Sequence, residues 1–175
     1  MNQQASDFFP SFKPHPFIKG GQLQTIFGQL NKLKKRHRPN GSRREYITFL
    51  DGDKTSILID EPTTPPLGSV VLFHGLGGSA HSTYCMRLSI KLVELGYRVI
   101  RYNHRGAGHG ELALAKGIYH CGVKGDLLTA VGWVAESFPS EIISLVGYSL
   151  SGTVLLNSLS ECDVEMRNFG LIDKA

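Results

Sequence analysis

A serine between small residues is the clearest sign of chemistry in the sequence. Ser149 lies in Gly147-Tyr-Ser-Leu-Ser-Gly152, after a β-branched apolar run and before a second apolar segment. Strand, sharp turn and helix around a serine are typical of a nucleophile elbow, G-x-S-x-G, whose hydroxyl attacks an acyl carbon. Ser151 replaces the second glycine but is small enough for the turn. Ser149 is therefore the candidate nucleophile, with Gly147 and Ser151 as supporting residues.

The glycine-rich stretch His74-Gly-Leu-Gly-Gly78 follows another apolar run. A serine that attacks a carbonyl needs N–H donors for the negative charge that develops on oxygen. In elbow-type enzymes one donor follows the serine, and the other comes from the loop after an earlier strand. The sequence therefore predicts an oxyanion hole made by the backbone N–H groups of Leu76 and Leu150, with His74 and Gly75 supporting the loop.

Two other readings of these stretches are weaker. Residues 75–80 also match G-x-G-x-x-A, a dinucleotide phosphate loop, but that loop needs an acid at the end of the next strand. The next strand ends Arg101-Tyr-Asn-His-Arg105, which contains no acid. A metal site is suggested by His104, His109 and His120, but no pair has the spacing of a known zinc motif, and they are interpreted as polar loop residues. We expect no metal and no cofactor.

The elements that must position these residues alternate along the chain. Strands are predicted over 46–50, 56–59, 69–73, 97–102 and 142–146, with the start of another at 169–172. Helices are predicted over 23–33, 84–95, from 126 to just before Pro139, and over 149–159. The turn at residues 51–53 makes the first two strands a hairpin. This order predicts an α/β fold with a mostly parallel sheet and an antiparallel N-terminal hairpin. Arg105 and Asp126 are candidates for an ion pair that holds the loop after the fourth strand.

Positive charge is concentrated near the N-terminus of the 175-residue chain. Residues 1–45 hold nine Lys/Arg and two acidic residues, whereas residues 46–175 hold ten and thirteen. We interpret residues 1–45 as a basic, aromatic-rich arm that is a solvated connection, because no nucleic-acid module accompanies it. Peripheral contact of this arm with an anionic membrane stays open as an alternative. No nucleic-acid partner is expected.

The remaining composition favours a reducing compartment. Three cysteines without C-x-x-C spacing and a start that lacks the regions of a signal peptide predict a cytoplasmic protein with free thiols. Residues 142–160 carry no charge over the length of a membrane span, but five serines and a glycine-containing turn favour strand-turn-helix instead. No transmembrane span is expected.

Several blocks, in order, resemble the YheT-like branch of the α/β-hydrolases, which are predicted serine esterases. These blocks are Gly21-Gln-Leu-Gln-Thr-Ile26, His74-Gly-Leu-Gly-Gly-Ser79 with Ser82-Thr-Tyr84, Asn103-His-Arg-Gly106, Ile118-Tyr-His-Cys-Gly122 with Asp126, and Gly147-Tyr-Ser-Leu-Ser151. In two of them Gln22 replaces a histidine and Ser151 a glycine of the family pattern. The resemblance implies hydrolysis of carboxylic esters of acyl or lipid-like substrates by a Ser-Asp-His triad without a metal.

The triad is incomplete in this sequence. In the family the acid and the histidine follow the serine, but the 26 residues after Ser149 contain no histidine. Residues 46–175 are therefore expected to be an incomplete α/β-hydrolase domain, truncated after the nucleophile helix. A longer parent or a C-terminal complementing polypeptide would complete the triad. The alternative is a truncated, non-catalytic remnant that acts through binding. Either way, ester turnover by this chain alone is expected to stay near background.

Overall fold

The computed structural model describes residues 16–18, 20–24, 41–108, 114–122 and 124–161. The chain divides into two compact units, residues 1–36 and 37–175. In the first unit, residues 21–24 form one helical turn, and the Gln24 side-chain amide donates to the carbonyl of Ile18 at 3.1 Å. Most of the helix predicted over 23–33 and the strand predicted at 169–172 lie outside the described residues.

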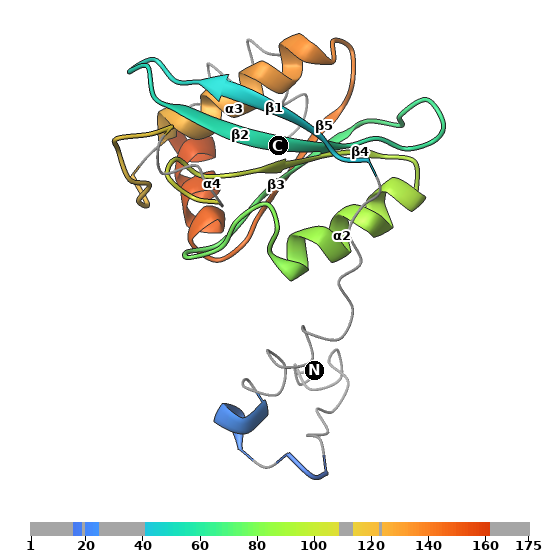
Figure 1. The fold of residues 1–175 in the computed structure, drawn as a ribbon, viewed down its shortest axis with the longest axis vertical. Helices are drawn as coiled ribbons and strands as arrows, with labels where there is room; N and C mark the ends of the chain where they lie inside the picture. Colours follow the sequence, from blue (N-terminus) through green and yellow to red (C-terminus); the bar gives the residue numbers. More distant parts are fainter. Residues whose placement is uncertain (1–15, 19, 25–40, 109–113, 123, 162–175) are drawn as a thin grey trace, which may run out of the picture. The chain divides into compact units, whose positions relative to one another are not determined.

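A five-stranded sheet forms the centre of the second unit (Figure 1). Its strands are β1 (Arg43–Thr48), β2 (Lys54–Asp60), β3 (Ser69–Phe73), β4 (Arg98–Tyr102) and β5 (Ile143–Gly147). Their order is β1-β2-β4-β3-β5, and β2 pairs antiparallel with both β1 and β4. The strands β4, β3 and β5 are mutually parallel. The predicted α/β fold, with a hairpin before a parallel core, is confirmed.

The β1–β2 hairpin turns where the sequence predicted it. The amide of Phe49 donates to the carbonyl of Asp53 at 2.8 Å, and Gly52 has a positive φ of 85°. Glycine adopts this backbone conformation without the steric cost that other residues incur. The strand β1 begins at Arg43 rather than at residue 46, because Arg43 already pairs with Ile59 of β2.

Each face of the sheet has its own helical layer. The helix α2 (Thr83–Glu94) places Leu88 and Leu92 against Val70 and Leu72 of β3. The helices α3 (Lys124–Ser137) and α4 (Leu150–Glu161) cover the other face (Figure 1). The alternation of side chains along a strand explains this division, because neighbouring residues point to opposite faces. The larger core cluster lies on the α3–α4 face and contains Ile47, Phe49, Ile57, Ile59, Val71, Phe73, Ile100, Tyr102, Leu127, Ala130, Val131, Val134 and Val154.

The end of α2 and the start of α3 differ from their predicted positions by one or two residues. Tyr97 donates to the carbonyl of Leu92 at 2.9 Å, and Gly96 has a φ of 90°, which together form a Schellman cap. The cap takes Tyr97, where the fourth strand was predicted to begin, out of β4, and it leaves Leu95 65% exposed. The helix α3 begins two residues before the predicted Asp126, whose carboxylate binds Arg105.

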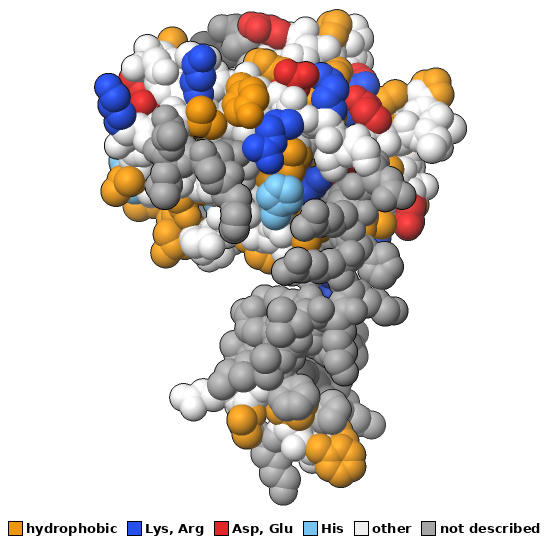
Figure 2. All heavy atoms as spheres, viewed as in Figure 1, with side chains coloured by type: hydrophobic (Ala, Val, Ile, Leu, Met, Phe, Trp, Pro, Cys, Tyr) orange, Lys and Arg blue, Asp and Glu red, His pale blue; other side chains and the backbone are white. Residues whose placement is uncertain are grey.

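On the face shown in Figure 2, described basic and acidic side chains of the second unit are interspersed with apolar ones. The described part of this face has no broad patch of a single charge. Among the described residues, no helix has the length and apolar character needed to cross a bilayer.

Candidate functional site

The carboxyl ends of the three parallel strands lie side by side. Phe73 of β3 is in register with Tyr102 of β4 on one side and with Gly147 of β5 on the other. The three segments that follow these residues are therefore brought together at one edge of the sheet, where α/β proteins bind their ligands. They begin with His74, Asn103 and Tyr148, the positions singled out in the sequence.

Ser149 lies on the tight turn between β5 and α4. Its φ is +53°, one of two positive values at non-glycine residues in the described chain, and its side chain is exposed. Strained backbone of this kind is concentrated at functional sites. A Cβ on Gly147 would lie 2.7 Å from the carbonyl oxygen of Ser151, so only glycine fits there. A Cβ on Gly75 would lie 3.3 Å from the Ser149 Cβ. The glycine-rich loop after β3 therefore faces Ser149 directly.

Ser151, the residue that departs from the elbow pattern, is fully buried and doubly hydrogen-bonded. Its hydroxyl donates to the carbonyl of His74 through a short hydrogen bond. The Ser151 Oγ lies 2.6 Å from the His104 Nε2, which must carry the proton because the Ser151 proton is already committed. The serine thus joins the segments that follow all three strands, a contact that a glycine cannot make.

His104 lies in the loop after β4, as predicted, and it is buried at this junction. Burial of the ring, together with nearby His74, lowers the pKa of His104 to about 3. Burial likewise lowers the pKa of His74. The His74 Nδ1 donates to the Gly75 carbonyl at 2.8 Å, and its Nε2 accepts the His104 amide at 3.2 Å. Both imidazoles are therefore neutral, and within the described chain neither hydrogen-bonds Ser149.

Tyr119 completes the packing around these rings. It stacks on His104 with ring centroids 4.6 Å apart and planes at 12°, and it forms a T-shaped pair with His74 with centroids 5.9 Å apart. Sequence reasoning placed this residue in a family block but gave it no role. The stacking depends on how the loop of residues 114–122 returns over the strand ends, which local sequence patterns do not encode.

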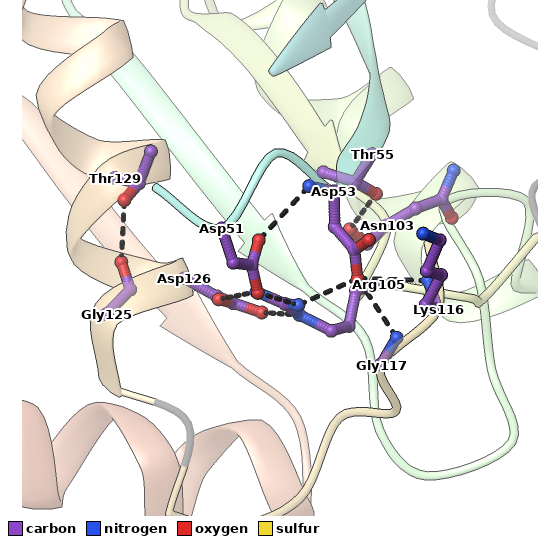
Figure 3. A network of polar contacts seen from close by, with 10 residues as sticks. All are labelled: Asp51, Asp53, Thr55, Asn103, Arg105, Lys116, Gly117, Gly125, Asp126 and Thr129. Atoms are coloured by element: carbon purple, nitrogen blue, oxygen red, sulfur yellow. Dashed lines mark hydrogen bonds and ion pairs between the residues drawn. The ribbon is translucent and has the colours of Figure 1, made fainter. Parts of the chain in front are cut away.

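The predicted pair of Arg105 and Asp126 is confirmed and forms part of a larger network (Figure 3). Arg105 binds both carboxylate oxygens of Asp126, at 2.7 and 2.6 Å, and also reaches Asp51 at 2.6 Å and Asp53 at 3.0 Å. Asp53 accepts the amides of Lys116 and Gly117, each at 3.0 Å. The hydrogen bonds from Arg105 lower the pKa of Asp51, and those from the Gly117 and Lys116 amides lower the pKa of Asp53. The network ties the hairpin turn, the loop that carries Tyr119 and the start of α3 to one guanidinium group.

The two predicted oxyanion donors belong to α4 and to the glycine-rich loop. Leu150 is the first residue of α4, where N–H groups have no partner within the helix. Leu76 lies at the tip of the loop, with its side chain 75% exposed. In the described chain no hydrogen bond uses the N–H of Leu76 or Leu150. Within the same residues, no group of three or more His, Cys, Asp or Glu has the arrangement of a metal site.

Restoring the family's glycine at position 151 is expected to destabilise the protein. Ser151→Gly removes both hydrogen bonds of the hydroxyl and leaves the His104 N–H buried without a partner, a loss of about 2 kcal/mol in unfolding free energy. Urea unfolding measures this loss. Thr153→Gly is the control, because it introduces glycine at an exposed position of the same helix. A Ser151→Gly protein as stable as the parent would show that these hydrogen bonds contribute nothing.

Acidification is expected to destabilise the fold before carboxylates titrate. The pKa of His104 is about 3 in the folded state, whereas an unfolded histidine titrates near 6.5. The unfolded chain therefore binds a proton that the folded chain rejects. Stability falls as the pH drops below about 6.5, and the slope approaches about 1.4 kcal/mol per pH unit near pH 5. Urea unfolding at several pH values measures the slope. His104→Gln should lower this slope, and His120→Gln, at an exposed position, is the control. A His104→Gln protein with the same slope as the parent would contradict the assignment of the pH dependence to His104.

Comparison with known proteins agrees with this geometry. A family model described as alpha/beta hydrolase fold matches residues 68–167. Human phospholipase ABHD3 is 31% identical over 115 residues, which cover 66% of this chain and 27% of that protein. The putative esterase YheT of Escherichia coli K12 is 29% identical over 155 residues, 86% of this chain and 44% of that protein. The resemblance to YheT-like hydrolases is thus confirmed, and the match spans less than half of either relative.

Solved structures show the same fold. An esterase from Pyrococcus furiosus superposes with a TM-score of 0.58 at 27% identity, over 70% of this chain and 47% of that one. A lidless serine hydrolase from Xanthomonas campestris gives a TM-score of 0.60 at 24% identity, over 71% of this chain and 58% of that one, which shows a shared fold alone. The family model matches more than half of the residues of this chain, and the chain therefore belongs to the alpha/beta hydrolase fold family.

Proposed function

We propose that this chain carries the nucleophile and the oxyanion hole of a serine ester hydrolase. Ser149 is the nucleophile, and the N–H groups of Leu76 and Leu150 receive the oxyanion. The observation that carries the proposal is the exposed Ser149 side chain on a turn with a φ of +53°, directly opposite Gly75 of the glycine-rich loop. A turn that holds a small polar residue in a disfavoured backbone conformation fits an exposed nucleophile better than a purely structural role.

The proposed step is acyl transfer. The Ser149 Oγ attacks the carbonyl carbon of an ester, and the new C–O bond places a negative charge on the carbonyl oxygen, facing the two N–H groups. Collapse of this intermediate breaks the bond to the alcohol and leaves an acyl-serine, which water then hydrolyses. The serine proton must pass to a base and then to the departing alcohol.

The base is proposed to come from polypeptide outside the described residues. The two ring nitrogens of His74 are occupied by the Gly75 carbonyl and the His104 amide, and the His104 Nε2 is occupied by the Ser151 hydroxyl. The sequence contains no histidine after Ser149, where YheT-like hydrolases have theirs. A longer parent chain or a complementing C-terminal polypeptide would supply the histidine and its acid. The chain alone should then retain only the rate contributed by binding and the oxyanion hole.

Acyl or lipid-like esters are the proposed substrates. Two large apolar side chains on the loops at this edge of the sheet are exposed: Leu76 on the glycine-rich loop at 75%, and Ile118 on the loop that carries Tyr119 at 80%. Ile118 precedes Tyr119, whose hydroxyl contacts the glycine-rich loop. An apolar surface next to a serine nucleophile favours an acyl chain over a charged substrate. The names of the similar proteins, a phospholipase and a monoacylglycerol lipase, agree with this class.

Covalent labelling of the intact chain by an alkyl fluorophosphonate tests the site without a complete triad. The Ser149 Oγ would bond to phosphorus, fluoride would leave, and the proton would pass to solvent. Leu76→Pro removes one N–H donor and is expected to slow labelling about 10²-fold. Leu76→Ala keeps the donor and should label within a few-fold of the parent. Equal rates for the proline and alanine variants would contradict the assignment of Leu76 to the oxyanion hole.

A further inference from the structure

The loop that carries Leu76 is held by hydrogen bonds on both sides of that residue. The amide of Gly75 donates to the Tyr84 hydroxyl at 3.0 Å, and the amide of Gly77 donates to the Tyr119 hydroxyl at 2.9 Å. The carbonyl of Gly75 also accepts the amide of Gly78 at 3.0 Å. The N–H groups before and after Leu76 are therefore occupied, and among the described hydrogen bonds none involves the N–H of Leu76 itself.

The two tyrosines come from different parts of the fold. Tyr84 lies in the first turn of α2, where its ring packs against Tyr148 with centroids 4.6 Å apart. Tyr84 also lies close to the loop backbone, since a Cβ on Gly78 would be 2.7 Å from its hydroxyl. Tyr119 is stacked on the buried His104 ring, which is itself bonded to Ser151. Each hydroxyl is thus fixed by aromatic packing that does not depend on the loop.

A glycine-rich loop needs such restraint. Glycine adopts positive and negative φ angles about equally readily, and Gly77 has a φ of +67°. The His74–Gly75 and Leu76–Gly77 peptides could therefore rotate at little cost if the N–H groups of Gly75 and Gly77 were not bound. The two tyrosine hydroxyls fix these flanking peptides from both sides. The Gly75–Leu76 peptide between them is also held at its carbonyl, which accepts hydrogen bonds from the Gly78 amide and the His74 Nδ1.

We infer that Tyr84 and Tyr119 are positioning residues that direct the Leu76 N–H at the oxygen of a substrate bound to Ser149. The inference rests on the proposed function of Ser149 and Leu76. Neither tyrosine is required to touch the substrate. They act by using up the two competing N–H groups of the loop, so that a single donor is presented beside that of Leu150. Geometric preorganisation of this kind is a main source of transition-state stabilisation.

The test is the rate of fluorophosphonate labelling in a double-mutant cycle. Tyr119→Phe and Tyr84→Phe keep the rings and remove only the hydroxyls, and each is expected to slow labelling about tenfold in the parent chain. In the Leu76→Pro background the same replacements should change the rate less than twofold, because the donor that they position is gone. Tyr46→Phe, at a 52% exposed tyrosine on β1, is the matched control and should have no effect in either background.

The outcomes separate the two proposals. Labelling that persists in Ser149→Ala would overturn the proposed function itself. Labelling that depends on Ser149 and Leu76 but not on either tyrosine hydroxyl would overturn only the positioning role. An equal tenfold loss in both backgrounds would mean that the tyrosines act on general structure, which also overturns it. Amide hydrogen exchange gives a second readout that needs no proline variant: Tyr119→Phe should accelerate exchange at Gly77 and Tyr84→Phe at Gly75, and unchanged exchange would contradict the inference.

Discussion

Replacement of Ser149 by alanine is expected to abolish labelling of the chain by an alkyl fluorophosphonate. The exposed Oγ of Ser149 is the only atom that the proposal assigns to bond with phosphorus, so its removal leaves the oxyanion hole with nothing to stabilise. Intact-protein mass spectrometry measures the result as the loss of a single added phosphonyl group. The fold should persist, because the side chain is exposed and makes no described hydrogen bond.

Ser140 provides the matched control. It is the other non-glycine residue with a positive φ in the described chain, at +68°, and it is also exposed. Ser140 precedes β5 and Ser149 follows β5, so the two serines lie at opposite ends of the same strand. Alanine imposes a similar backbone strain at both positions. Ser140→Ala should therefore label like the parent, and equal loss in both variants would show that labelling reports on folding and not on a nucleophile.

The largest effect on stability is expected from Asp126→Ala. The Asp126 carboxylate binds the Arg105 guanidinium with two hydrogen bonds, and its side chain is only 9% exposed. Removal of one partner from a buried ion pair leaves the other desolvated and under-satisfied, which typically costs at least about 3 kcal/mol. Asp53 and Asp51 remain, so the loss should be near that lower figure. Urea unfolding of the folded chain measures it as a reduced midpoint.

The carboxylate of Asp51 offers the comparison. It contacts the same guanidinium at 2.6 Å, but its side chain is 55% exposed. Water already screens this pair, and Asp51→Ala should change the unfolding midpoint far less than Asp126→Ala. Because the network also anchors the loop that carries Tyr119, Asp126→Ala should slow labelling of Ser149 as well. A midpoint that moves equally in both variants would mean that burial does not set the strength of these contacts.

Much of the framework follows from local sequence patterns. A strand was predicted over the apolar run 69–73, and β3 has those bounds with every residue buried. Gly96 marked the end of α2 because only glycine enters the left-handed region without cost. The pairing of Arg105 with Asp126 was also predicted, as a contact that holds the loop after the fourth strand.

The contacts within the site were less accessible to sequence reasoning. His104 was predicted to be a polar loop residue, but its burial and its hydrogen bond to Ser151 were not predicted. The signal was present, because a serine in place of the elbow glycine brings a buried hydroxyl that must find a partner. Its partner, and the stacking of Tyr119 on the same ring, depend on how three separate loops pack together. Such contacts join residues far apart in the chain, and no periodicity records them.

Mapping the phosphonylated residue tests the central claim most directly. The intact chain is labelled with an alkyl fluorophosphonate and digested with trypsin, and the peptide of residues 125–167 is fragmented, because it contains Ser140, Ser149 and Ser151 together. The account predicts one phosphonyl group, located on Ser149. A modification distributed over several serines, or located on a residue other than Ser149, would show that the turn after β5 does not present a nucleophile to the glycine-rich loop.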